Sequence, residues 1–168
     1  MDALKGLFSL IDRRLSYMKA VAAYKWSEGL SIDDAGREDI VLRDSLSAAA
    51  DMGLDVESMR EFFLLQIKIA KHVQTAWHNK WNLEGFLFLP QDGQSNTDLE
   101  AQIRPALIEI GAGIVRKIRE TLPLLQNKDC RARSVTLIRA ELKTEFIEDE
   151  MKIKLLDALA RIKATVQT

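Results

Sequence analysis

Apolar residues return at steps of three and four along most of this 168-residue chain, the spacing that gathers side chains on one face of an α-helix. The first such stripe consists of Leu4, Leu7, Phe8, Ile11, Leu15, Met18 and Ala22. The chain contains only three prolines and eight glycines, which favours long helices over strands joined by turns. The pattern predicts an all-α bundle of about six helices, with residues 1–168 forming a single domain.

Capping residues and breaks in the stripes give the expected helix limits. The expected helices cover residues 4–28, 34–52, 55–81, 98–125, 129–143 and 148–166. Asp33, Asp55 and Asp129 are the expected caps of the second, third and fifth helices, and Pro105 is expected to bend the fourth. Residues 82–97 contain glycine, proline and small polar residues and are expected to form the one long loop.

Composition and charge exclude several classes of protein. The net charge of −1 provides no basic surface for nucleic acid. No run of 18 apolar residues is present, so no membrane-spanning helix is expected. The first residues lack the pattern of a signal peptide, so we expect either a cytoplasmic protein or a mature form without its leader. Cys130 is the sole cysteine, which rules out an intrachain disulfide.

Polar residues interrupt the apolar stripes in register. Arg14 and Lys25 lie eleven residues apart, so on one helix they would project within roughly 20° of each other at the edge of the stripe. Gln66, Ala70 and Gln74 form a row one turn apart between large apolar residues. Taken singly, each is most often a cation that reaches water or a core amide bonded to the backbone. Together they predict a cationic, amide-lined pocket that suits a small dianion.

These residues resemble the all-helical AroQ class of chorismate mutases, and in particular its exported (gamma) subclass. The match runs through Arg14, residues 21–26 (Val-Ala-Ala-Tyr-Lys-Trp), residues 32–34 (Ile-Asp-Asp), Arg37, Glu38, Phe62, Phe63, residues 66–71 (Gln-Ile-Lys-Ile-Ala-Lys), Gln74, Trp81, residues 98–99 (Asp-Leu) and residues 103–105 (Ile-Arg-Pro). It covers residues 7–110 well and the last third only in helical character. The resemblance implies an isomerase of the shikimate pathway to aromatic amino acids, which rearranges chorismate to prephenate without a cofactor or metal. It also implies a homodimer, each site built within one chain, in the periplasm or secreted.

The resemblance assigns catalytic roles to Arg14, Lys25 and Gln74, and a substrate-binding role to Arg104. Arg14 and Arg104 are expected to grip the two carboxylates of chorismate. Lys25 and Gln74 are expected to donate hydrogen bonds to the ether oxygen, on which negative charge builds in the transition state. Because no proton is transferred, no nucleophile or general base is needed.

Five further positions are assigned to the pocket wall. Glu38 is expected to accept from the ring hydroxyl of the substrate, and Asp34 and Arg37 to shape the wall. Ala70 stands where many relatives have Ser or Thr, and Val41 replaces a polar residue of some members. Both departures remove polar groups, which affects the expected affinity more than the activity.

Other functions remain open from the sequence. A mutase-like protein that binds ligands without catalysis is one alternative, because two polar groups are missing. A helical interaction protein is another, although it does not explain the polar residues in register. A di-iron bundle is disfavoured because no Glu-x-x-His pair is present. The cysteine that pairs with the counterpart of Cys130 in several exported relatives is absent, which weakens the inference of an oxidising compartment.

Overall fold

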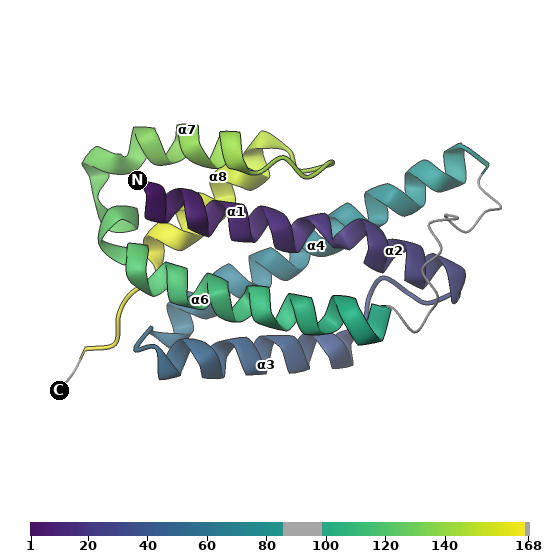
Figure 1. Cartoon of the computed structure of the whole chain (residues 1–168), viewed down its shortest axis with the longest axis horizontal. Helices are drawn as coiled ribbons and strands as arrows, with labels where there is room; N and C mark the ends of the chain where they lie inside the picture. The colour runs from purple at the N-terminus through teal and green to yellow at the C-terminus, as the bar shows by residue number, and fades with distance from the viewer. Residues whose placement is uncertain (86–98, 167–168) are drawn as a thin grey trace.

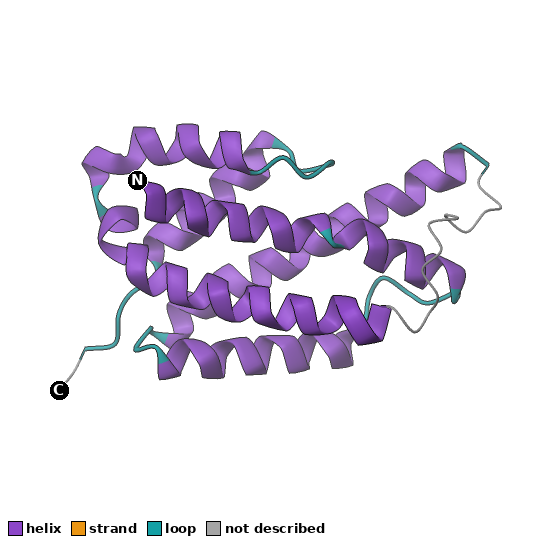
Figure 2. Cartoon of the chain, viewed as in Figure 1, coloured by secondary structure: helices purple, strands orange, loops and turns teal. Residues whose placement is uncertain are grey.

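The computed structural model of the chain describes residues 1–85 and 99–166, which form an all-helical bundle (Figures 1 and 2). Its helices are α1 (Asp2–Ser16), α2 (Met18–Ser27), α3 (Ala35–Asp51), α4 (Val56–Leu83), α6 (Arg104–Gln126), α7 (Arg131–Glu141) and α8 (Asp149–Arg161), with a π-helical turn η1 (Leu99–Ile103) and a 3₁₀ turn η2 (Lys128–Cys130). Within these residues the only β-type pairing is one isolated bridge between Leu54 and Ala164. The prediction of an all-α fold is confirmed.

The first expected helix is interrupted at one residue. Tyr17 separates α1 from α2, although its backbone stays right-handed at φ −72° and ψ −13°. The two helices therefore continue end to end, as the purple ribbon in Figure 1 shows. Arg14 therefore lies on α1 and Lys25 on α2, rather than on the single unbroken helix that the spacing predicts.

Two of the three expected caps were wrong. Asp34, not Asp33, caps α3, because its carboxylate accepts from the backbone N–H of Arg37 at 3.0 Å. Asp129 does not cap α7; its own N–H donates to Asn127, which caps the 3₁₀ turn before that helix. The third expected cap is confirmed, because the Asp55 carboxylate accepts from the N–H of Ser58 at 2.9 Å.

The last expected helix was too long. α8 ends at Arg161 rather than at residue 166, because the following residues pair with the segment before α4. The N–H of Asp55 donates to the carbonyl of Lys163, and the N–H of Thr165 donates to the carbonyl of Gly53, both at 2.9 Å. An extended backbone at residues 163–165 makes these bonds, which a continued helix would not.

Pro105 begins a helix instead of bending one. It lies in the first turn of α6, where its missing N–H costs no hydrogen bond. The expected loop at residues 82–97 and the expected helix start at Asp98 fall mostly in residues 86–98, outside the described residues. No helix in the part of the chain that the structure describes is long and apolar enough to cross a membrane.

Two apolar clusters fix the helices on either side of a central region. The larger contains the fully buried Leu7, Phe8, Phe62 and Ile118 and joins α1, α4 and α6 to the helices at the opposite end from α2. The smaller lies between α2 and α4 and is formed by Met18, Ala22, Val73, Trp77 and Trp81. Because α1 packs on α6, α2 on α4, and α3 on both α4 and α6, these helices enclose the region between the clusters.

Asp12 ties α1 to the connection that follows α7. Its Oδ1 atom accepts from the backbone N–H groups of Lys143 and Thr144, each at 2.8 Å, and from the Thr144 hydroxyl at 2.8 Å. Hydrogen bonds to a charged acceptor contribute more than neutral ones, and removing the acceptor leaves backbone donors without a partner.

Asp12→Ala is therefore expected to lower the free energy of unfolding by about 2 kcal/mol, measured by urea denaturation followed by circular dichroism. Asp51→Ala is the matched control, because Asp51 is exposed in the last turn of α3. Equal stability of the two variants would contradict a role of Asp12 in holding the connection.

Candidate active site

A cavity of about 750 Å³ lies between α1, α2, α3, α4 and α6. All nine residues that the sequence singled out for the site line this cavity: Arg14, Lys25, Asp34, Arg37, Glu38, Val41, Ala70, Gln74 and Arg104. They come from separate helices of one chain, so no second subunit is needed to bring them together.

Arg14 is held against α6 at the cavity wall. Its Nη1 atom donates to the backbone carbonyl of Leu107 at 3.2 Å. Burial lowers the pKa of Arg14 below its ordinary value, and the nearby positive charge of Arg37 lowers it further. Arginine remains protonated at neutral pH, so two guanidinium groups repel each other here. A bound carboxylate would relieve that repulsion.

Lys25 connects α2 to the segment that leads into α3. Its ammonium donates to the backbone carbonyl of Ile32 at 2.7 Å. Burial lowers the pKa of Lys25 from 10.5, while the carboxylates of Asp34 and Glu38 act in the opposite direction. The ammonium has two further N–H donors, which can serve a ligand in the cavity.

The start of α3 presents charged residues to the cavity. With Asp34 as the cap, Arg37 and Glu38 both fall in the first turn of the helix. The Glu38 carboxylate forms an ion pair with Lys71 of α4 at 2.9 Å, and Lys71 also reaches Asp33 at 3.0 Å. The hydrogen bonds to Glu38 and Asp33 raise the pKa of Lys71 above 10.5. The cap thus sets the direction of α3, and Lys71 ties that end of the helix to α4.

The amide row, which consists of Gln66 and Gln74 with Ala70 between them on α4, faces the cavity. Gln66 and Gln74 are both buried, at 6% and 5% exposure. The Nε2 atom of Gln74 donates to the Met18 sulfur at 3.4 Å, which is a weak acceptor. The Oε1 atoms of both glutamines have no hydrogen-bond partner among the described residues. Buried amides with unused hydrogen-bonding capacity are expected where a ligand supplies the partner.

The cavity is less cationic than the sequence predicted. Its lining includes five basic residues, Arg14, Lys25, Arg37, Lys71 and Arg104, and four acidic residues, Asp33, Asp34, Glu38 and Asp44. The acidic residues come from the start and middle of α3 and the segment before it, whereas Arg14 and Arg104 come from other helices. The charge is therefore divided within the cavity, which suits a ligand that has both carboxylates and a hydroxyl group.

Sequence reasoning gave no role to Lys71. It follows Ala70 directly on α4 and lies four residues after Ile67, another lining residue, so the helical spacing was the available signal. His72 and His78 do not line the cavity, and the Nε2 atom of His78 lies 2.8 Å from the Ala22 carbonyl. Among residues 1–85 and 99–166, no cluster of His, Cys, Asp and Glu is arranged to hold a metal ion.

Fold and cavity together define a helical bundle with an internal cavity that is lined by arginine, lysine and glutamine side chains of one chain. Residues 5–75 match the family model described as chorismate mutase type II. The chain is 34% identical over 113 residues to a secreted chorismate mutase of Yersinia pestis; this alignment covers 67% of the chain and 58% of that relative. The chain thus spans little more than half the length of that curated relative.

Solved structures extend the similarity to nearly the whole chain. The crystal structure of the secreted chorismate mutase from Yersinia pestis superposes with a TM-score of 0.78 at 25% identity, covering 95% of this chain and 97% of the other. The crystal structure of a chorismate mutase from Burkholderia phymatum superposes with a TM-score of 0.79 at 25% identity, covering 99% of this chain and 98% of the other. Residues 5–75 thus form a region of the chorismate mutase type II family, and the fold of the whole chain is similar to that of solved chorismate mutases.

Gln74→Leu is expected to stabilise the ligand-free protein by up to about 1 kcal/mol, because it removes a buried amide oxygen that lacks a partner among the described residues. Thermal unfolding followed by circular dichroism measures the change. Thr75→Leu is the matched control, because Thr75 is the next residue of α4 and its side chain is exposed. A lower melting temperature for Gln74→Leu than for the control would show that the amide contributes to folding.

Proposed function

We propose that this protein catalyses the rearrangement of chorismate to prephenate. The observation that carries the proposal is the cavity in which Arg14, Lys25, Gln74 and Arg104 meet from separate helices of one chain. In this reaction a C–O bond breaks while a C–C bond forms, and no proton is transferred. The charged and amide groups of the cavity are therefore sufficient, and no cofactor takes part in the proposed reaction.

Arg14 and Arg104 are proposed to hold the two carboxylates of chorismate. A guanidinium group donates two parallel hydrogen bonds to a carboxylate, which fixes its orientation as well as its position. Holding both carboxylates favours the compact conformation in which the reacting atoms are close. The repulsion between Arg14 and Arg37 supports this assignment, because an anion at that place reduces it.

Lys25 and Gln74 are proposed to donate to the ether oxygen of chorismate. Negative charge builds on this oxygen as its bond to carbon lengthens, so both contacts strengthen toward the transition state. The Nε2 atom of Gln74 donates to a weak sulfur acceptor, and the Lys25 ammonium uses one of its three donors on Ile32. Both groups are thus available in a site that is already folded around them.

The remaining wall residues are proposed to recognise the substrate ring. Glu38 accepts from the ring hydroxyl, while Asp34 and Arg37 shape the wall beside it. Ala70 and Val41 line the cavity without a hydrogen-bonding group, so we expect weaker binding than in relatives with polar residues there. The alternative function is a mutase-like protein that binds chorismate without converting it, because two polar groups of the relatives are missing.

We also propose the assembly and compartment implied by the relatives. Residues 1–168 act as one catalytic domain, in a homodimer in which each chain holds a complete site. The name of the secreted relative from Yersinia pestis supports export to the periplasm or medium. Sedimentation equilibrium tests the dimer, and fractionation of cells that express the full coding sequence tests the compartment.

Lys25→Ala is expected to lower kcat by on the order of 10²-fold or more, because it removes a fixed donor to the developing charge. The assay follows the loss of ultraviolet absorbance as purified protein consumes chorismate. Lys68→Ala serves as the control, because Lys68 is an exposed lysine of α4 outside the cavity lining. Wild-type protein that binds chorismate but leaves its absorbance unchanged would support the binding function instead of the enzyme.

The activity is expected to change little between about pH 5 and 8, because neither a glutamine amide nor an arginine titrates in this range. At alkaline pH, kcat/KM should fall at a pH below the ordinary lysine pKa of 10.5, because burial lowers the pKa of Lys25 and only the ammonium form donates. Steady-state kinetics across this range provide the measurement. A steep rise toward acid pH would instead indicate that a protonated carboxyl group donates to the substrate.

A further inference from the structure

We propose that Lys71 is a positioning residue that holds the carboxylate of Glu38 for the substrate hydroxyl and closes one wall of the active site. This inference rests on the proposed function. Lys71 lies on α4, beside the amide row, and its ammonium contacts Glu38 at 2.9 Å and Asp33 at 3.0 Å. It does not have to touch the substrate to act in this way.

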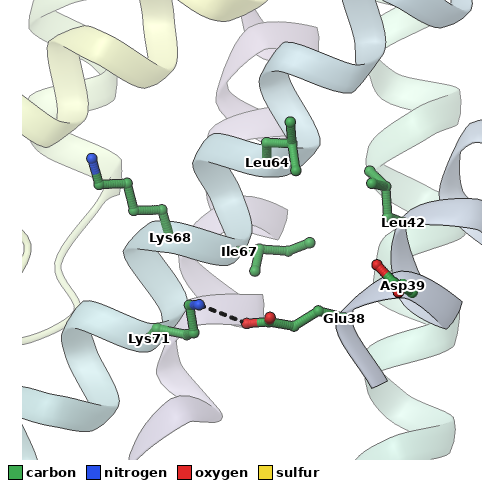
Figure 3. A pocket seen from close by; sticks show the side chains of 7 residues that line it. All are labelled: Glu38, Asp39, Leu42, Leu64, Ile67, Lys68 and Lys71. Atoms are coloured by element: carbon green, nitrogen blue, oxygen red, sulfur yellow. Dashed lines mark ion pairs between the residues drawn. The ribbon is translucent and has the colours of Figure 1, made fainter. Parts of the chain in front are cut away.

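A second, outer groove of about 340 Å³ lies between α3 and α4, and Glu38 and Lys71 of this ion pair are among the residues that line it (Figure 3). Glu38, Ile67 and Lys71 line both this groove and the larger cavity. The same three side chains therefore form the partition between the two spaces. The dashed contact in Figure 3 joins α3 to α4 across that partition.

The Glu38 carboxylate can point toward either the cavity or the outer groove, because Glu38 lines both. Its side chain is 28% exposed, and that of Lys71 is 32% exposed, so the pair is partly shielded from water. Lys71 forms an ion pair with Oε1, which is buried and has no hydrogen-bond partner among the described residues, so this oxygen can still accept from a ligand hydroxyl. Without the ammonium, the carboxylate can turn toward water in the outer groove, and the partition loses its charged contact.

The contact with Asp33 makes Lys71 more than a single ion-pair partner. Asp33 belongs to the segment between α2 and α3, whose Ile32 carbonyl accepts from Lys25. Lys71 thus fixes both this segment and the first turn of α3 relative to α4. The expected result of losing it is a misplaced Glu38, while Gln74 stays in place on its own helix and Lys25 keeps its separate hydrogen bond to Ile32.

Lys71→Met is expected to raise KM for chorismate about tenfold while kcat stays within about threefold, because the contact to an unreacting hydroxyl forms in both the ground state and the transition state. Lys71→Arg should restore most of the loss, since a guanidinium can still reach the carboxylate. The measurement is steady-state kinetics at constant ionic strength, with circular dichroism to verify folding. Lys71→Gln is a second neutral variant, in case Lys71→Met does not fold.

Lys68→Met is the matched control for the loss of charge. Lys68 lines the same outer groove from α4, but its ammonium points away from Glu38 (Figure 3). The Lys68→Met substitution removes the same charge from the same helix without breaking the Glu38–Lys71 ion pair. The KM of this variant should therefore stay within about twofold of wild type.

A double-mutant cycle separates positioning from a general structural effect. In a Glu38→Gln background, Lys71→Met should change KM by less than about twofold, because the neutral amide is no longer held by the ammonium. Independent effects of the two substitutions, or a wild-type KM in a folded neutral variant at position 71, would overturn the inference. A wild-type protein that does not convert chorismate at all overturns the proposed function itself, which is a distinguishable result.

Discussion

The structure depends on keeping positive charges at the wall of a cavity that the surrounding helices do not fill. Moving a guanidinium group away from water is costly unless other groups compensate, and Arg14 donates to a neutral acceptor, the Leu107 carbonyl. The apolar clusters on either side hold the helices apart at this place. Burial of those clusters stabilises the fold, while the cavity between them keeps amide oxygens that have no partner among the described residues.

Helical periodicity was enough to predict the fold class and most helix limits, because burial of one apolar face determines where a helix lies. Local details were decided by hydrogen bonds that the periodicity does not contain. Asp33 and Asp34 are adjacent acids, either of which can cap a helix; the ion pair with Lys71 uses one and leaves the other as the cap. The early end of α8 likewise follows from backbone pairing with Gly53, a long-range contact.

The positions of the cavity residues were predictable in part. The row of Gln66, Ala70 and Gln74 is fixed by the geometry of a single helix, so its common face followed from spacing alone. The prediction that Arg104 lines the cavity rested on the family resemblance. Residue spacing within one helix does not tell how α6 lies relative to α1. The near balance of acidic and basic side chains was not predicted, because it depends on how closely the start of α3 approaches α4. Sequence reasoning assigned Lys71 no role for the same reason, because its contact with Glu38 also depends on how α3 approaches α4.

Under the proposed function, the division of charge in the cavity explains how one small site binds a dianion and also favours its rearrangement. If every wall were cationic, the carboxylates could bind in several orientations with similar affinity. Acidic residues at the start of α3 exclude carboxylates from that wall and leave it to a hydroxyl donor, which selects one orientation. In that orientation the remaining donors, Lys25 and Gln74, are fixed before the substrate arrives, so little reorganisation is required as charge develops. The same acids oppose the lowering of the Lys25 pKa that burial causes, which connects substrate orientation and charge stabilisation through one group of side chains.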